Sequence, residues 1–257
     1  MNLNQSEYGI EIKNYLKIFK KRKVIDNIDI KVTRGSIHGF IGPNGAGKTT
    51  TIKALIGGFI PNKGEFLING LKAGSLEAKK MIGYIPENAR FPHKMKAIKY
   101  LQMMAELSGL TSKEASILAE EKLKEIGLWD QKNMDPNRFS SGMKKKLLFA
   151  QALINKPNVL ILDEPAANLD PTARYDLFSQ MKKWARQENA TIFISSHILQ
   201  ELQDIVDEIT ILDKGRVVFT GKIKEFIQED EYIIHLDNFE LQTQIIETLK
   251  NLNFDCA

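Results

Sequence analysis

The stretch Gly42-Pro43-Asn44-Gly45-Ala46-Gly47-Lys48-Thr49-Thr50 decides the fold that we expect of this chain. An apolar run at 37–41 comes directly before it and is typical of a buried strand. After it, a helical segment begins near Lys48 and ends at Gly57-Gly58. A strand, a glycine loop and a helix in this order are the context in which the pattern G-x-x-x-x-G-K-S/T forms a phosphate site.

Each residue type in this loop suits a phosphate group. The three glycines let backbone N–H groups curl around an anion without clashes from Cβ atoms, and the following helix adds the positive end of its dipole. Lys48 can reach the β- and γ-phosphates as a compact charge, and the Thr49 hydroxyl can ligate Mg²⁺. The sequence therefore predicts a site for a nucleoside triphosphate and Mg²⁺.

The composition is that of an ordinary globular protein. Of 257 residues, 43% are hydrophobic and 26% are charged, and the formal net charge of +4 does not by itself indicate nucleic-acid binding. The single Cys256 excludes an internal disulfide framework and a cysteine-rich zinc site, which favours a reducing, cytoplasmic compartment. The sequence has neither a signal-peptide core nor a run of about 18 apolar residues, so we expect any membrane-spanning part to belong to another chain.

The other strand patterns lie on both sides of the loop. Apolar runs at 10–15 and 24–32 flank a basic turn at 20–23 and predict an antiparallel hairpin. The basic turn could touch nucleic acid, but a solvated hairpin tip is the interpretation that we favour. We expect further strands at 65–70, 82–85, 159–162 and 191–197, a hairpin at 209–212 and 217–219, and a last strand at 232–236.

The hydrophobic period becomes helical in three places. From 95 to 126 it predicts helical structure, with Thr111 and Glu114 spaced as a capping box and Gly127 as a stop. A second helix opens within 139–146, and Asp170-Pro171 begins a long third helix with the aspartate as its N-cap. We also expect a short helix at 241–252.

Two carboxylates follow a buried strand at the carboxyl edge of the predicted sheet. The apolar run at 159–162 leads directly into Asp163-Glu164, and ligands of open α/β sheets bind at this edge. Asp163 is suited to hold Mg²⁺, directly or through water, and Glu164 to orient or deprotonate an attacking water. His197 ends a neighbouring strand, where an imidazole is either structural or in contact with a γ-phosphate.

These motifs, in this order, resemble the nucleotide-binding subunit of ABC transporters from about residue 8 to residue 225. The resemblance implies that 42–50 is the Walker A loop, that Glu164 is the catalytic carboxylate of Walker B, and that Lys48 and His197 also act in catalysis. It implies that Phe19 stacks on the adenine. It assigns four further nucleotide-binding residues to the signature and the D-loop: Ser140, Ser141, Gly142 and Asp170.

Two positions depart from the pattern of the family. The signature stretch, usually Leu-Ser-Gly-Gly-Gln, ends here in Met143, which removes a glutamine amide while Ser140 and Gly142 are kept. Glu87 stands where the family usually has glutamine, in the loop that senses the metal, so it adds a charge beside Mg²⁺. In both features, this chain resembles the branch of ABC ATPases that pairs with multidrug- or polysaccharide-type exporter permeases.

The resemblance implies an α/β fold: a P-loop NTPase core of ABC-ATPase type with an antiparallel N-terminal β portion. We predict one ATPase domain at 1–225 with a helical subdomain inserted at about 95–142, and a small strand–helix appendage at 226–257. The implied mechanism is a head-to-tail dimer, of identical chains or of two paralogues, that closes on ATP and Mg²⁺. The dimer drives a separate transmembrane permease at the cytoplasmic face of the membrane.

Two other functions are alternatives to a transporter ATPase. A soluble ABC ATPase acting on nucleic acid or the ribosome would need a long coiled coil or a second cassette, and neither is in the sequence, so we expect no nucleic-acid partner. A subunit that clamps ATP without hydrolysing it is disfavoured by Glu164 and His197, while Glu87 and Met143 leave room for it.

Overall fold

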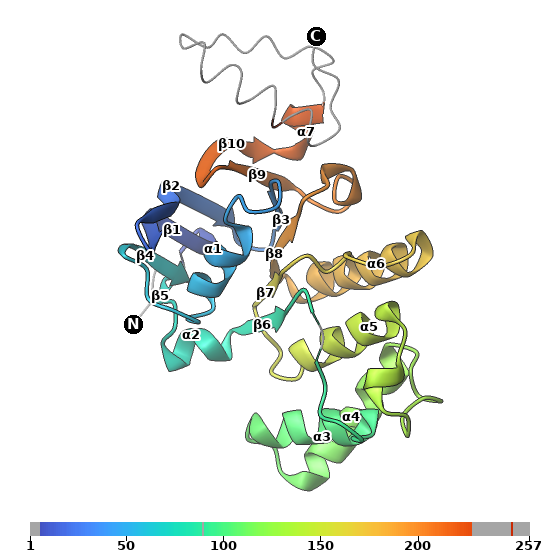
Figure 1. Cartoon of the computed structure of the whole chain (residues 1–257). Coiled ribbons are helices and arrows are strands. Elements are labelled where there is room, and N and C mark those ends of the chain that lie inside the picture. The colour runs from blue at the N-terminus through green and yellow to red at the C-terminus, as the bar shows by residue number, and fades with distance from the viewer. Residues whose placement is uncertain (1–5, 89, 228–247, 249–257) are drawn as a thin grey trace, which may run out of the picture.

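A six-stranded sheet forms the centre of the molecule (Figure 1). The structure is a computed structural model that describes residues 6–88, 90–227 and 248. The strands run in the order β10-β9-β3-β8-β7-β6, and all neighbours are parallel except the hairpin of β9 and β10. They are β3 (Ile37–Ile41), β6 (Ile82–Ile85), β7 (Val159–Leu162), β8 (Thr191–Ser196), β9 (Glu208–Asp213) and β10 (Arg216–Lys222).

The apolar runs of β3, β7 and β8 are buried along their whole length. This burial agrees with their place inside a parallel sheet that is covered on both faces. Because these strands are parallel, their carboxyl ends meet at one edge, and the loops that leave this edge carry the predicted phosphate-site residues.

A smaller antiparallel sheet covers one face of the central sheet. Its order is β2-β1-β4-β5, from β1 (Tyr8–Phe19), β2 (Arg22–Thr33), β4 (Lys63–Ile68) and β5 (Leu71–Lys72). Its apolar side chains pack with helix α1 (Lys48–Leu55) and with one face of the central sheet, including Phe40, Ile161 and Phe193. The helix that follows the glycine loop therefore lies in the core that the two sheets share.

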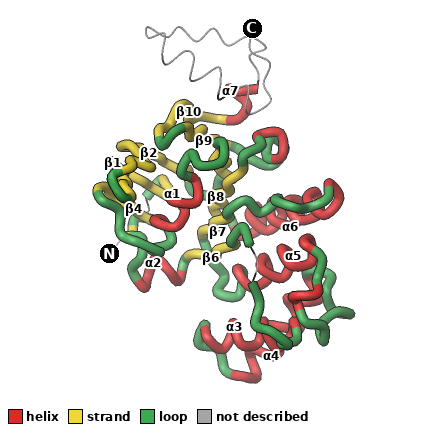
Figure 2. Tube along the Cα trace, in the orientation of Figure 1, coloured by secondary structure: helices red, strands yellow, loops and turns green. Residues whose placement is uncertain are grey.

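Helices cover the opposite face, where a second core includes Ile41, Leu162 and Ile194. These helices are α3 (Ala97–Leu107), α4 (Ser112–Glu125), α5 (Ser141–Ala152) and α6 (Pro171–Glu188), with short 3₁₀ turns at Pro136–Arg138 and Leu199–Glu201. Figures 1 and 2 show α5 and α6 nearest to the strands, and α3 and α4 farther out. This outer pair, joined to the core through the loop after β6, is the helical subdomain expected from the sequence.

The predicted α/β architecture is confirmed: a parallel core that carries the glycine loop, an inserted helical part and an antiparallel β portion. The capping box at Thr111 and Glu114 and the N-cap at Asp170 are also confirmed. Three short elements were not predicted: β5, α2 (Leu76–Lys80) and α7 (Ile223–Ile227). Runs of two to five residues carry too few repeats to show a period.

The predicted C-terminal strand at 232–236 lies outside the described residues, as does the helix at 241–252 apart from Thr248. The domain limits at 1–225 and 226–257 stay a prediction. Among the residues that the structure describes, no helix combines the length and the apolar character needed to span a bilayer.

Candidate nucleotide site

The glycine loop joins the end of β3 to the start of α1, and its backbone leaves room only for glycine at two points. A Cβ atom on Gly42 would lie 2.2 Å from the carbonyl oxygen of Leu212. Gly47, the N-cap of α1, has φ of 116°, and a Cβ there would meet Ile25 at 2.4 Å. Leu212 belongs to β9, the neighbour of β3 in the central sheet, and Ile25 belongs to β2 of the small sheet. The two sheets thus hold the loop against the start of α1.

Lys48 begins α1 and is buried, with 6% of its surface exposed. Its ammonium donates hydrogen bonds to the carbonyl oxygens of Gly42 at 2.5 Å and Pro43 at 3.3 Å, and lies 3.1 Å from Glu164 Oε1. The cation is therefore fixed inside the loop by neutral carbonyls and one carboxylate. A phosphate bound by the loop would meet this charge already in place.

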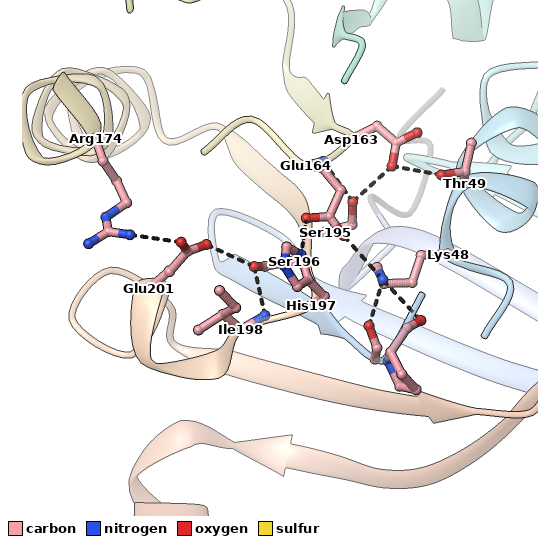
Figure 3. A network of polar contacts seen from close by, with 12 residues as sticks. Lys48, Thr49, Asp163, Glu164, Arg174, Ser195, Ser196, His197, Ile198 and Glu201 are labelled. Carbon is pink, nitrogen blue, oxygen red and sulfur yellow. Dashed lines mark hydrogen bonds and ion pairs between the residues drawn. The ribbon is translucent and has the colours of Figure 1, made fainter. Parts of the chain in front are cut away.

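Asp163 lies at the end of β7 and faces the loop (Figure 3). Its Oδ1 accepts hydrogen bonds from the hydroxyls of Thr49 at 3.2 Å and Ser195 at 3.0 Å. Burial raises the pKa of this carboxyl, and the negative charges of Glu164 and Glu87 add to the rise, while the two hydroxyls oppose it. A carboxylate under these conditions gains stability from a cation beside it.

Glu164 follows Asp163 in a left-handed backbone conformation, with φ of 45°. This rare conformation, anchored by the hydrogen bond that Glu164 N–H donates to Ser195 Oγ at 3.0 Å, turns the two adjacent carboxylates in different directions. Glu164 Oε2 lies 2.9 Å from Nδ1 of His197. The structure thus brings together Lys48, Glu164 and His197, the three residues for which the sequence predicts catalytic roles.

Behind His197, a chain of polar contacts leads to α6 (Figure 3). Ser196 Oγ accepts from the N–H of Ile198 at 3.0 Å and donates to Glu201 Oε2 at 3.1 Å. Glu201 Oε1 in turn accepts from Arg174 Nη1 at 2.7 Å. Sequence reasoning missed Ser195, Glu201 and Arg174, because no local pattern marks partners that are distant in the chain.

A fourth residue missed from the sequence is Lys145, on α5. Its Nζ donates to the carbonyl oxygens of Pro86 at 3.1 Å and Glu87 at 2.5 Å, in the loop after β6. Burial lowers the pKa of this lysine to about 8, although the charges of Glu87, Asp163 and Glu164 work in the opposite direction. The Glu87 side chain itself is exposed.

The remaining predicted residues lie apart from this cluster. Phe19 is half exposed at the tip of the β1–β2 hairpin, where its ring meets Phe59 edge-on with 6.0 Å between the centroids. Ser140 caps α5 by accepting from Met143 N–H at 3.3 Å, and Ser141 begins that helix. Asp170 caps α6 by accepting from Ala173 N–H at 2.9 Å.

The oxygen atoms of Thr49 and Asp163 beside the glycine loop suit Mg²⁺, which needs few protein ligands, better than a metal ion whose ligands all come from the protein. Within the described part of the chain, no group of three or more His, Cys, Asp or Glu side chains is arranged to bind a metal ion. Mg²⁺ typically takes one or two protein oxygens and fills its other positions with phosphates and water. The Asp163 carboxylate and the Thr49 hydroxyl, 3.2 Å apart, are a donor pair of that kind.

Comparison with known proteins agrees with this chemistry. A family model described as ABC transporter matches residues 25–167. A putative ABC transporter ATP-binding protein of Mycoplasma pneumoniae is 37% identical over 224 residues, 86% of this chain and 69% of that protein. The bacitracin transport ATP-binding protein BcrA of Bacillus licheniformis is 36% identical over 211 residues, 81% of this chain and 68% of that protein. A solved structure of an ATP-binding subunit of an ABC transporter matches with a TM-score of 0.75 and 28% identity, over 95% of this chain and 97% of that chain.

A site that can hold a triphosphate and set a carboxylate base beside it defines a nucleoside triphosphatase of the P-loop class. The family match covers more than half of the chain, and relatives above 30% identity match most of it. The chain belongs to the ABC transporter family, as an ATP-binding subunit that hydrolyses ATP and works with a membrane permease.

Proposed function

We propose that this chain powers an exporter, as half of a head-to-tail ATPase dimer docked on its permease at the cytoplasmic face of the membrane. The second half is an identical copy or a paralogue. Each ATP lies between the glycine loop, Asp163 and Glu164 of one chain and the Ser140–Gly142 stretch of the other. The main support for the ATPase role is the geometry around Lys48, whose ammonium is held by the carbonyls of the glycine loop and by Glu164.

The need for two chains rests on where the two halves of the site lie. Helix α1, which follows the glycine loop, packs in the core on one face of the central sheet. Helix α5, which begins at the signature stretch, packs in the core on the other face. Ser140 and Ser141 are exposed at the start of α5, so the backbone N–H groups there are available to an anion on a second chain.

The residues of the site divide the work of hydrolysis. The loop amides and Lys48 hold the β- and γ-phosphates, and Phe19 offers a ring face to the adenine. Glu164 takes a proton from the attacking water, and His197, 2.9 Å from that carboxylate, fixes its direction and contacts the γ-phosphate. Mg²⁺ held at Thr49 and Asp163, with Glu87 reaching it through water, would screen the charge of the phosphates.

Export as the direction of transport is supported by the Nod factor export ATP-binding protein I of Cupriavidus metallidurans, 29% identical over 244 residues, and by the Glu87 and Met143 departures. We assign the selection of the transported molecule to the permease, because the path across the membrane belongs to that separate chain.

The direct test is Glu164→Gln. An amide cannot act as a base, so the ATPase rate should fall by a factor of about 10² or more. Nucleotide binding should remain, because the loop amides and Lys48 are untouched. An ATP-dependent dimer should then accumulate on gel filtration, since reopening follows hydrolysis.

Glu121→Gln is the matched control, because Glu121 is exposed on α4 and far from the loop in the chain. It should behave as the unaltered protein in both assays. If Glu164→Gln hydrolyses ATP at the unaltered rate, Glu164 is not the base and the assignment of the site is wrong.

A further inference from the structure

A buried cation, Lys145, lies where α5 meets the loop after β6. Only 4% of the residue is exposed. Its ammonium donates to two backbone carbonyl oxygens of that loop, of Pro86 at 3.1 Å and of Glu87 at 2.5 Å. The two ends of the contact are 58 residues apart in the sequence, so it joins two separate segments of the fold.

This lysine is not explained by stability. Burying an ammonium is unfavourable unless it is paired, and two neutral carbonyls offset the loss of water only in part. Among the described residues, no carboxylate forms an ion pair with Lys145, and the lowered pKa reflects this poor solvation. An apolar side chain of similar length would fill the same space without a charge.

The neighbouring lysines differ from Lys145 in this respect. Lys146 pairs with Asp176 on α6 at 3.4 Å and is partly exposed, as expected of a surface ion pair. Lys144 is only half buried. Of these three consecutive lysines, Lys145 is therefore the one whose charge is directed into the protein.

The two segments that Lys145 joins serve different nucleotides under the proposed function. The loop at Pro86–Glu87 follows Ile85, whose carbonyl oxygen accepts from Asp163 N–H at 2.9 Å, so the loop starts beside the carboxylate that we propose for the metal site. Ser140, five residues before Lys145, is the N-cap of helix α5, and this end of the helix would contact the nucleotide held by the partner chain. A shift of the loop backbone would reach α5 directly through these two hydrogen bonds of one side chain, at 3.1 and 2.5 Å.

We infer that Lys145 is a positioning residue that couples the nucleotide bound at the glycine loop of one chain to the signature helix that closes on the nucleotide of the other. It touches neither ATP nor metal. It holds the Pro86–Glu87 backbone and α5 as one body, so that ordering of the loop by bound ATP sets the direction of the Ser140 end. The inference rests on the proposed dimer.

The experiment compares Lys145→Met, Lys145→Arg and the control Lys144→Met in the full-length chain. Methionine keeps length and packing but cannot donate, whereas arginine keeps the cation. We would measure kcat and KM for ATP, the melting temperature, and ATP affinity at protein concentrations too low for dimers. In the Glu164→Gln background, sedimentation would give the dissociation constant of the ATP-bound dimer.

For Lys145→Met we expect kcat to fall, and the dimer dissociation constant to rise, by about tenfold, the effect of losing a charged hydrogen bond. ATP affinity of the monomer should stay within about twofold, and the melting temperature should be unchanged or higher, because a buried charge has been removed. Lys145→Arg should recover most of the activity, and Lys144→Met should match the unaltered chain.

Two results would overturn the inference. One is unaltered kcat and dimerisation in Lys145→Met; the other is a fall in kcat that is matched by a lower melting temperature and lost ATP affinity, which indicates a structural role. If the unaltered chain itself neither hydrolyses ATP nor dimerises with it, the proposed function fails first and the inference falls with it.

Discussion

At the scale of single residues, the site is a balance of charges around the glycine loop. Lys48 contributes one buried cation beside Glu164, at 3.1 Å, while Asp163, Glu164 and the nearby Glu87 contribute three carboxylates. Burial is the main cause of the raised pKa of Asp163, and the negative charges of Glu164 and Glu87 add to it. A divalent cation bound there, as we propose, would offset this charge, and each carboxylate should affect how strongly it binds.

Glu87 gives a test of that balance. Glu87→Gln removes one negative charge but keeps a polar group, so the Mg²⁺ concentration at half-maximal ATPase rate should rise modestly, by about two- to threefold at an exposed position. Glu87→Ala should raise it further, because the water-mediated contact is also lost. ATP binding should remain in both variants, since Lys48 and the loop amides are unchanged.

The measurement is the ATPase rate as a function of Mg²⁺ concentration, with Glu121→Gln as the control for a lost surface charge. Curves for both Glu87 variants that superimpose on that of the unaltered chain would leave Glu87 with no role at the metal.

Some residues of the site could be predicted from the sequence and others could not. Lys48, Thr49 and the 163–164 pair were predictable because each belongs to a local pattern at a strand end. Ser195 and Lys145 were not, since their roles depend on a hydroxyl or an ammonium reaching an atom 31 or 58 residues away. Such partners exist only once the sheet and α5 are packed.

At the scale of elements, the end of β8 is connected to the first turns of α6. Arg174 and Glu201 form an ion pair at 2.7 Å, with side-chain exposures of 33% and 13%, and Glu201 also accepts from Ser196, the residue before His197. Asp170, the predicted D-loop residue, caps the same helix. We therefore expect a displacement of α6 to reach His197, which lies 2.9 Å from Glu164.

Glu201→Gln tests this connection. The amide keeps an acceptor for Ser196 but loses the charge that holds Arg174, so His197 should be less well fixed. We expect kcat to fall by about threefold to tenfold with KM for ATP nearly unchanged, an effect of about 1 kcal/mol that is typical of a partly exposed ion pair.

A matched control lies on the same helix. Arg186 of α6 pairs with Asp207 at 2.6 Å, also partly exposed but away from His197, so Asp207→Asn should leave kcat unchanged. Adding Arg174→Met to Glu201→Gln should reduce kcat no further, because the two residues act through one contact. Additive losses would show that they act separately.

At the scale of the whole molecule, most of the fold could be predicted from the sequence, because the main strands are uninterrupted apolar runs and the main helices have clear capping residues. The strand at 159–162 and the helix starting at Asp170-Pro171 were placed to within a residue. The sequence did not show which apolar residues face each side of the central sheet. Phe40 and Ile41 are neighbours in β3, but their side chains belong to the cores on opposite faces of that sheet. That division follows from the pleat once both faces are covered.

The two sheets are also joined by a buried polar network that sets how the molecule responds to acid. Glu208 of β9 accepts from the Thr33 hydroxyl at 2.6 Å and lies 3.4 Å from Nδ1 of the buried His38, whose Nε2 is 2.9 Å from Thr210 Oγ1. The hydrogen bond with His38, and then that with Thr33, lower the pKa of Glu208 to about 2, against the effect of burial. Burial lowers the pKa of His38, while the contact with Glu208 works in the opposite direction.

The sign of the effect follows from these directions. As pH falls below the ordinary value of 4.5 for a glutamate, the unfolded chain takes up a proton that folded Glu208 refuses until about pH 2. Glu208 therefore stabilises the fold fully above pH 4.5, and this contribution is lost between there and about pH 2. After allowance for partial exposure, it is on the order of 2 kcal/mol.

Glu208→Gln should accordingly lower the free energy of unfolding by that amount at pH 7, and the difference from the unaltered chain should shrink as the pH falls from 4.5 toward 2. Urea unfolding at a series of pH values measures it. Because Glu208 also raises the pKa of His38, the same pair of chains should be compared in a His38→Gln background, where the histidine contributes nothing to the pH dependence. Glu121→Gln, which alters an exposed carboxylate, should give a difference near zero at every pH. A Glu208→Gln difference that is constant with pH would mean that the network stabilises the two sheets through packing and neutral hydrogen bonds rather than through the carboxylate charge.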